Sequence, residues 1–297
     1  MASSSRTWIT VSKLVGILLA TGILAAGLLL PYVGGLGLAA RHEADKFLTT
    51  GCNLTESAPP QATTLYADDG KTVVARIFTQ DRLPVPLTQV PQYLQDALVA
   101  TEDRRFFSHH GVDMRGLIRS AVNTSSGDTQ GGSTLTMQYV KQIRYYQAGT
   151  DLAKQQAAIA QNLNRKMEDA KCALQFEQRE KKPEILDNYL NIAFFGENAY
   201  SVESASEIYF GISVDKLQLH QAAMLVGILR APSDYDPFKH PQQARDRRNQ
   251  VIQNMVTAGD LTEAQAKVWQ AKPNDLSTTT APTLEQGCYN APNTIAN

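Results

Sequence analysis

The stretch Thr101–Gln142, TEDRRFFSHHGVDMRGLIRSAVNTSSGDTQGGSTLTMQYVKQ, decides how the rest of the chain is interpreted. Apolar residues recur at helical spacing just before it, which predicts a helix over Val90–Ala100. Glu102 and Asp103 then stand at the C-terminal end of that helix, where the helix dipole favours cations rather than acids. The turn Gly131–Thr134 closes the stretch and can bring backbone N–H and hydroxyl groups close to a ligand before a second helix. A pair of acids at a helix end is ordinarily only solvated. Whether Glu102 and Asp103 have a function therefore depends on the residues around them.

Five ordered motifs make the chain resemble a known family. ED-x-x-F-x-x-H-x-G, from Glu102 to Gly111, and GG-S-T-x-T-x-Q-x-x-K, from Gly131 to Lys141, are similar to the first two motifs of the peptidoglycan glycosyltransferase domain (glycosyltransferase family 51). That domain occurs in class A penicillin-binding proteins and in monofunctional transglycosylases. The later motifs are resembled by Arg165-Lys166-x-x-Asp169, Lys182–Asn191 and Arg247-x-x-x-Val251-Ile252, the first of them imperfectly. The resemblance runs from about Leu65 to about Met255.

The resemblance implies a fold and an activity. The fold would be mainly α, a lysozyme-like α+β domain, and the enzyme would polymerise lipid II into glycan strands, releasing undecaprenyl pyrophosphate. Its partners would be lipid II, the growing lipid-linked glycan, the cytoplasmic membrane and other cell-wall synthesis proteins that maintain cell shape. The formal net charge of −1 gives no support for binding to nucleic acid. With 43% apolar residues in 297, the chain can bury a sizeable core.

Joining two sugars requires a base for the acceptor hydroxyl and cations for the departing lipid pyrophosphate. Glu102 is the predicted general base, and Asp169 is the predicted second catalytic acid. The family has a glutamate at the position of Asp169; here Glu168 stands beside it, and only one of the two can face the site. We expect Asp169 to do so. The predicted substrate-binding residues are Asp103, Phe106, His109, Gly132, Ser133, Thr134, Gln138, Lys141, Arg165, Lys166 and Arg247.

Two rival functions fit parts of the pattern. A lytic muramidase also uses two carboxylates, although it has no pyrophosphate to neutralise with Lys141 and Arg165. A membrane-anchored scaffold with a decayed site would explain two departures from the family, Met137 in place of a common glutamine and Asp169 in place of glutamate. No ligand cluster calls for a metal, and a divalent Mg²⁺ or Mn²⁺ ion bridging the pyrophosphate is compatible with the chemistry.

The chain is expected to contain five regions. Residues 14–40 carry no charge and are long enough to span a bilayer, with Arg6 and Lys13 preceding them. The positive-inside rule places residues 1–13 in the cytoplasm and everything after the single span outside. Residues 41–80 would form a stalk with a β-hairpin at Asp68–Lys71, or else the edge of the main fold. Residues 81–270 are the predicted glycosyltransferase domain, and 271–297 a flexible tail or a linker to a missing domain.

Further helices are expected on either side of the later motifs. Val112–Val122 is amphipathic and would either pack on its neighbour or dip into the membrane, followed by a polar flap at Asn123–Thr129. Three cysteines leave at least one unpaired; Cys172 reads as a small buried hydrophobe, and Cys52 and Cys288 could form a disulfide. The remaining predicted helices are Asp151–Gln175 with a break near Asn162–Asn164, Phe176–Asn191, Glu203–Phe210, Leu217–Leu229 and Ala244–Met255.

The transpeptidase motifs of bifunctional relatives are missing from this sequence. Ser213-Val214-Asp215-Lys216 matches the first of them, Ser-x-x-Lys, but it lies inside the glycosyltransferase region without its companions. We therefore expect either a monofunctional enzyme or the N-terminal portion of a longer protein.

Overall fold

The computed structural model describes residues 63–78, 80–116, 132–160, 162–277 and 287–288, together with a few isolated positions before residue 60. The chain divides into two units, 1–52 and 53–297, and the second contains all the elements discussed below. The predicted span 14–40 lies almost wholly outside the described residues. Within the described part of the chain, no helix has both the length and the apolar character needed to cross a membrane. The predicted flap and most of Val112–Val122 also lie outside it.

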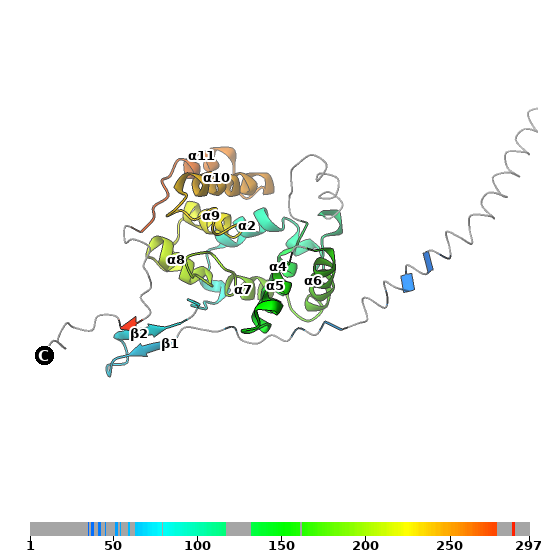
Figure 1. Ribbon diagram of the computed structural model, residues 1–297. Helices are drawn as coiled ribbons and strands as arrows, with labels where there is room; N and C mark the ends of the chain where they lie inside the picture. The colour runs from blue at the N-terminus through cyan, green and yellow to red at the C-terminus, as the bar shows by residue number, and fades with distance from the viewer. Residues whose placement is uncertain are drawn as a thin grey trace, which may run out of the picture. The chain divides into compact units, whose positions relative to one another are not determined.

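The predicted β-hairpin is confirmed. Strands β1 (Thr63–Tyr66) and β2 (Val73–Ile77) pair antiparallel, with Thr63 opposite Ile77. The turn between them is closed by Asp69, whose Oδ1 accepts from the backbone N–H groups of Lys71 at 2.8 Å and Thr72 at 2.7 Å. A third strand, β3 (Gly287–Cys288), adds to the open side of β2 (Figure 1). Part of the segment that was expected to be a flexible tail therefore returns to the hairpin.

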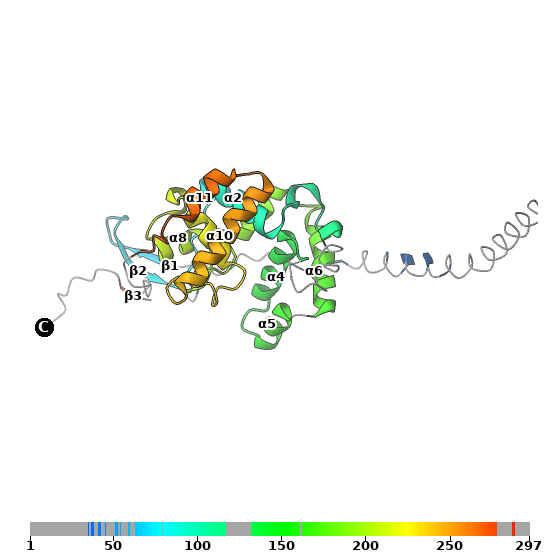
Figure 2. The same ribbon diagram turned by 90° about the horizontal axis from the view of Figure 1, so that it is seen from above.

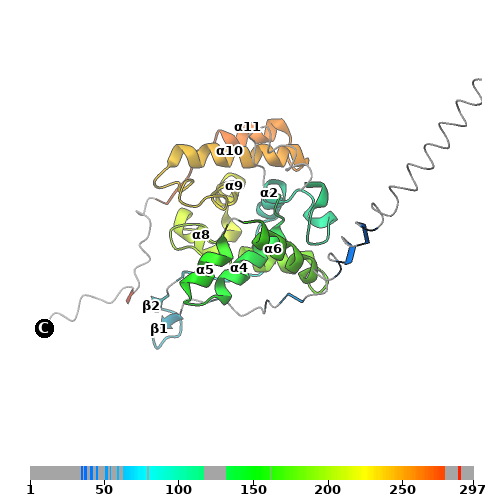
Figure 3. The ribbon, with the colours of Figure 1, turned by 45° about the vertical axis from the view of Figure 1, so that its right-hand side comes forward.

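One group of helices is built around α9 (Leu219–Ile228). Every residue of α9 is buried, which confirms the prediction that an almost wholly apolar run forms a core helix. It packs against α2 (Gln92–Glu102) and α10 (Pro241–Ala258), and α11 (Glu263–Gln270) covers α10 (Figure 3). α11 was not predicted, although Thr262 and Gln265 form the capping box that marks its start.

A second group is built around α4 (Leu135–Gln147), which contacts α5 (Leu152–Ile159), α6 (Leu163–Phe176) and α7 (Lys182–Leu190). Figure 2 shows α4 with α5 and α6. The break predicted near Asn162 is confirmed, because Asn162 caps α6 by accepting from the N–H of Arg165 at 2.8 Å. The prediction of continuous helix over Phe176–Asn191 is wrong, since a turn separates α6 from α7. α8 (Val202–Phe210) contacts α9 and so belongs to the first group.

The basic residues of α10 are not all solvated. Arg248 is fully buried, and its guanidinium donates at 2.9 Å to the carbonyl groups of both Pro273 and Gln270. A buried guanidinium is stable only when its N–H groups find acceptors, and the segment after α11 supplies them. His220 of α9 holds the same segment through Asp275 at 2.8 Å. These contacts tie the end of the helical domain to its core.

The cysteines differ from expectation in one respect. Cys172 is buried, as predicted, but it is disulfide-bonded rather than a free small hydrophobe, and Cys52 is disulfide-bonded as well. The side chain of Cys288 lies outside the described part of the structure.

Candidate active site

Glu102 is the last residue of α2, and its carboxylate contacts one residue of α4 and one of α10. One carboxylate oxygen, Oε2, accepts a hydrogen bond from Gln138 Nε2 of α4 at 2.9 Å. The other, Oε1, lies 3.9 Å from Arg247 Nη2 of α10. The side chain stays 17% exposed. Glu102 is thus held by two groups of the protein and still accessible to a ligand.

Gln138 is in turn held by a buried phenol. The hydroxyl of Tyr189, on α7, donates to Gln138 Oε1 at 3.0 Å. With its oxygen engaged, the amide of Gln138 must turn its N–H₂ group toward Glu102. Burial raises the pKa of Tyr189, and the negative charge of Glu102 adds to this effect, so the hydroxyl stays protonated. A chain of two hydrogen bonds therefore orients the predicted base.

Arg247 is the cation beside Glu102. Its side chain is only 6% exposed, and it donates to Gln250 at 2.7 Å. Burial lowers the pKa of Arg247, while Glu102 opposes that shift. Arg247, like Arg248, is thus buried, whereas basic residues on an amphipathic helix are ordinarily solvated.

Asp169 lies in a group of cations that we call the cation cluster: Lys141, Arg144 and Arg165. Arg165 donates to Asp169 Oδ2, and Arg144 Nε lies 3.4 Å from Oδ1. The Asp169 side chain is 3% exposed. Burial raises the pKa of Asp169, and the charges of Arg165, Arg144 and Lys141 oppose this shift. Three cations against one carboxylate leave the cluster with an excess positive charge.

Lys141 lies within electrostatic reach of both acids. Burial lowers its pKa, Arg165 adds to this effect, and Asp169 and Glu102 oppose it. The residue stands one helical turn after Gln138 on α4, so both side chains share a face of that helix. The same helix therefore carries Gln138, whose amide orients Glu102, and Lys141, a member of the cation cluster.

Glu168 and Asp169 have different environments. Glu168 pairs with Lys171 at 3.1 Å and its side chain is 45% exposed. Asp169 alone contacts the arginines. The helical register, rather than side-chain length, thus decides which acid joins the cluster, as the sequence predicted.

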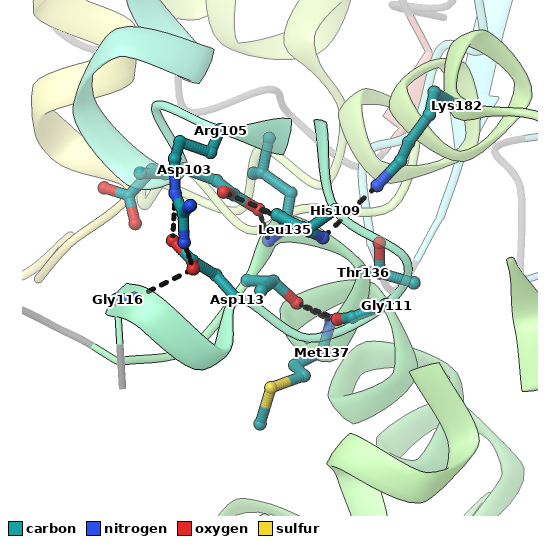
Figure 4. Close-up of polar contacts among 12 residues, drawn as sticks. Asp103, Arg105, His109, Gly111, Asp113, Gly116, Leu135, Thr136, Met137 and Lys182 are labelled. Atoms are coloured by element: carbon teal, nitrogen blue, oxygen red, sulfur yellow. Dashed lines mark hydrogen bonds and ion pairs between the residues drawn. The ribbon is translucent and has the colours of Figure 1, made fainter. Parts of the chain in front are cut away.

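Four residues of the first two motifs that are predicted to bind substrate are buried and make contacts within the protein. Asp103 accepts from the backbone N–H of Leu135 at 3.1 Å and contacts His109 Nε2 at 2.8 Å, and all three are buried (Figure 4). Phe106 is fully buried. Thr134 caps α4 by accepting from the N–H of Met137 at 3.2 Å, and donates to the carbonyl of Gly111 at 2.6 Å.

Gly111 shows why the first motif ends in glycine. Its φ is +75°, and a Cβ placed there would lie 2.6 Å from backbone atoms of Ala173 and Leu174 in α6. Only glycine allows the loop to approach α6 this closely in the left-handed conformation. The motif thus specifies a close backbone contact that brings α2, α4 and α6 together.

The remaining predicted residues lie near these groups. Gly132 and Ser133 are half-buried and directly precede the cap of α4. Lys166 is half-buried and follows Arg165 on α6. Successive helix residues point about 100° apart, so Lys166 projects in a different direction from Arg165.

Comparisons with known proteins identify the family. The family model described as Transglycosylase matches residues 69–256. The chain belongs to the transglycosylase family. Penicillin-binding protein 1A of Aquifex aeolicus is 37% identical over 217 residues, which is 72% of this chain and 28% of that protein. Penicillin-binding protein 1A of Escherichia coli is 37% identical over 203 residues, covering 68% of this chain and 22% of that protein.

This transglycosylase chain therefore spans less than a third of the length of these curated relatives. A solved structure of penicillin-binding protein 1A from Haemophilus influenzae is also similar, with 23% identity and a TM-score of 0.40. That match covers 75% of this chain and 22% of the other. The family assignment stands on the sequence match alone.

Three residues of the transglycosylase site escaped the sequence analysis. Arg144 follows Lys141 by one helical turn and could have been found from that spacing. Tyr189 lies within the motif Lys182–Asn191, and its hydroxyl contact with Gln138 carries no sequence signal. Lys182 is the first residue of that motif, and its ammonium lies 3.5 Å from His109 Nδ1.

Proposed function

We propose that this protein is a peptidoglycan glycosyltransferase that polymerises lipid II, with Glu102 as general base. The arrangement of the two acids carries the proposal: Glu102 is accessible and weakly engaged, whereas Asp169 is buried among arginines. A general base must reach a substrate proton, and a developing pyrophosphate needs fixed cations. Glu102 meets the first requirement and the cation cluster meets the second. Helix α4 contributes to both, with Gln138 beside Glu102 and Lys141 in the cluster.

The reaction would be a single inverting displacement. Glu102 accepts the proton of the acceptor sugar hydroxyl as the hydroxyl oxygen attacks the anomeric carbon of the donor glycan. The bond from that carbon to the pyrophosphate oxygen breaks, and its electron pair leaves with undecaprenyl pyrophosphate. Lys141, Arg144 and Arg165 receive the developing negative charge. Asp169 in this scheme orients two guanidiniums and transfers no proton.

The residues present do not fit a divalent ion held by the protein. Both acids already face cations, Arg247 beside Glu102 and two arginines beside Asp169, which leaves no cluster of free oxygen ligands between them. Within the described ranges, no group of three or more His, Cys, Asp or Glu side chains could hold a metal. We propose that neutralisation of the leaving group is assigned to side chains. A chelator titration of the polymerisation rate tests this.

The membrane-related part of the proposal rests on the sequence. Residues 14–40 would anchor the chain, and the domain after them would lie outside the cytoplasmic membrane beside its lipid-linked substrate. Protease treatment of intact spheroplasts should digest the domain if this orientation is correct. Protection of the domain until the membrane is lysed would reverse the orientation.

The deciding experiment is a polymerisation assay with labelled lipid II in detergent. The wild type should produce lipid-linked glycan strands, and Glu102→Gln should lower the rate by about 100- to 10,000-fold, the usual contribution of a general base. Glu168→Gln is the matched control, because it removes a half-exposed glutamate with an ion pair of its own and should retain activity. Hydrolysis of preformed glycan by the wild type would instead indicate a muramidase, and failure to bind lipid II would indicate a scaffold.

A further inference from the structure

A continuous set of polar contacts joins the end of α2, the start of α4 and the start of α7, next to the candidate site. We call it the buried ring, and it consists of Asp103, His109, Lys182, Glu177 and the first two residues of α4, Leu135 and Thr136. Figure 4 shows Asp103, His109 and Lys182 in sequence around the start of α4. Nothing in the motif pattern assigned a role to Lys182 or Glu177.

The contacts follow one another without a gap. Asp103 contacts His109 Nε2 at 2.8 Å, and His109 Nδ1 faces Lys182 Nζ at 3.5 Å. Lys182 Nζ donates to Glu177 at 2.7 Å. Glu177 accepts from the hydroxyl of Thr136, and Asp103 accepts from the N–H of Leu135 at 3.1 Å. The set thus leaves α4 at Leu135 and returns to it at Thr136.

The buried ring joins the elements that carry the reacting groups. Asp103 directly follows Glu102, so its two contacts fix the end of α2. Leu135 and Thr136 form the first turn of α4, one turn before Gln138, which orients Glu102. Any movement of α4 relative to α2 would have to break a charged hydrogen bond in the ring. The contacts of the buried ring therefore fix the distance between Glu102 and Gln138.

The chemistry of Lys182 also specifies the state of His109. An ammonium group donates hydrogen bonds and cannot accept them, so the facing Nδ1 atom must act as the acceptor. The proton of the neutral imidazole then lies on Nε2 and points at the carboxylate of Asp103. Lys182 Nζ also lies 4.3 Å from the centroid of the Phe106 ring, which explains why the first motif places an aromatic residue there. Lys182 on one side of His109 and Asp103 on the other therefore require the same tautomer.

We propose that Lys182 and Glu177 are positioning residues for the glycosyl transfer, acting on Glu102 through His109, Asp103 and α4. The proposal rests on the proposed function. It assigns to α7 and to the turn before it a role in the geometry of the base rather than in packing alone.

The first test is the variant Lys182→Met, assayed for lipid II polymerisation. We expect kcat to fall about 10- to 100-fold, the cost of a displacement on the order of 1 Å at a reacting group, with KM for lipid II unchanged. His220→Gln is the matched control, since it removes the contact of another buried histidine with an aspartate and should lower Tm without lowering kcat. An unchanged kcat in Lys182→Met would overturn the proposal.

The double variant Lys182→Met/Glu177→Gln separates positioning from stability. Lys182→Met alone leaves the buried Glu177 carboxylate without its cation, whereas the double variant removes both charges and should recover most of the lost Tm. We expect kcat to stay low in the double variant, because His109 still lacks its donor. Recovery of kcat together with Tm would show a purely structural role.

Nitrogen-15 NMR of the histidine side chains tests the buried ring without any activity. Wild-type His109 should show the Nε2–H tautomer, because Asp103 at Nε2 can only accept and Lys182 at Nδ1 can only donate. Lys182→Met should keep this tautomer and shift the Nδ1 resonance, because Nδ1 loses its donor. The Nδ1–H tautomer in the wild type would contradict the proposal. Because this measurement does not depend on catalysis, it distinguishes failure of the ring from failure of the proposed function.

Discussion

The two acids of the candidate site have opposite surroundings. Glu102 is 17% exposed and is held by a neutral amide on one oxygen and a distant guanidinium on the other. Asp169 is 3% exposed and is bound by Arg165, with Arg144 3.4 Å away. A carboxylate that must accept a proton has to remain reachable, whereas one that orients cations is best buried among them. The difference in their surroundings supports the proposal that the two acids have different roles despite having the same chemical group.

The largest effect on the polymerisation rate is expected when the accessible acid, Glu102, is shortened. Glu102→Asp withdraws the carboxylate from the acceptor hydroxyl while keeping its charge, and we expect the polymerisation rate to fall about 100-fold. The reciprocal change Asp169→Glu should cost less than about 10-fold, because a longer acid can still contact the arginines. Equal losses in the two variants would contradict the distinction between them. Steady-state rates with labelled lipid II measure both.

Removing the charge of the buried acid should affect stability as well as activity. Asp169→Asn leaves Arg144 and Arg165 facing each other without a carboxylate, and we expect a loss of about 3 kcal/mol in the free energy of unfolding. The rate should fall about 10-fold as the guanidiniums lose their fixed positions. Urea unfolding and the polymerisation assay test this. If Asp169→Asn were inactive but fully stable, Asp169 would act directly in proton transfer.

The pH dependence of the polymerisation rate tests the role of Lys141. Burial lowers its pKa below the usual 10.5, so its positive charge is lost as pH rises through that lowered value. Between the lowered pKa and 10.5 the unfolded chain binds more protons than the folded one, so the stability contribution of this group rises with pH while activity falls. Lys141→Arg keeps the charge and should extend the alkaline limb of the pH–rate profile. An identical alkaline limb in both proteins would remove Lys141 from the step.

The smallest effect is expected from the outer end of the hydrogen-bond chain. Tyr189→Phe removes the donor to Gln138 Oε1 and leaves the amide free to rotate. We expect a loss of about 1 kcal/mol in stability and a rate reduction of a few-fold. Thermal unfolding and the same polymerisation assay measure the two effects. A loss as large as that of Glu102→Asp would place Tyr189 in direct contact with substrate.

Local patterns predicted the elements of this protein well. Helical periodicity correctly located α2 and α9, and the Asp-Gly turn located the β1–β2 hairpin. The ordered motifs also named Glu102, Gln138, Lys141 and Arg165, which the structure places in or beside the candidate site. These features depend on residues close in sequence, where backbone propensity and spacing are sufficient.

Tertiary packing decided which of the motif residues are buried and which are accessible. The motif pattern treated Asp103, Phe106, His109 and Thr134 like the accessible residues, and only the approach of α4 to the end of α2 showed that they are internal. Arg144, Tyr189 and Lys182 come from segments that meet only after folding. Burial and hydrogen-bond partners follow from contacts distant in the chain. The sequence alone therefore determined which chemical groups are available, and packing decided which of them can reach a substrate.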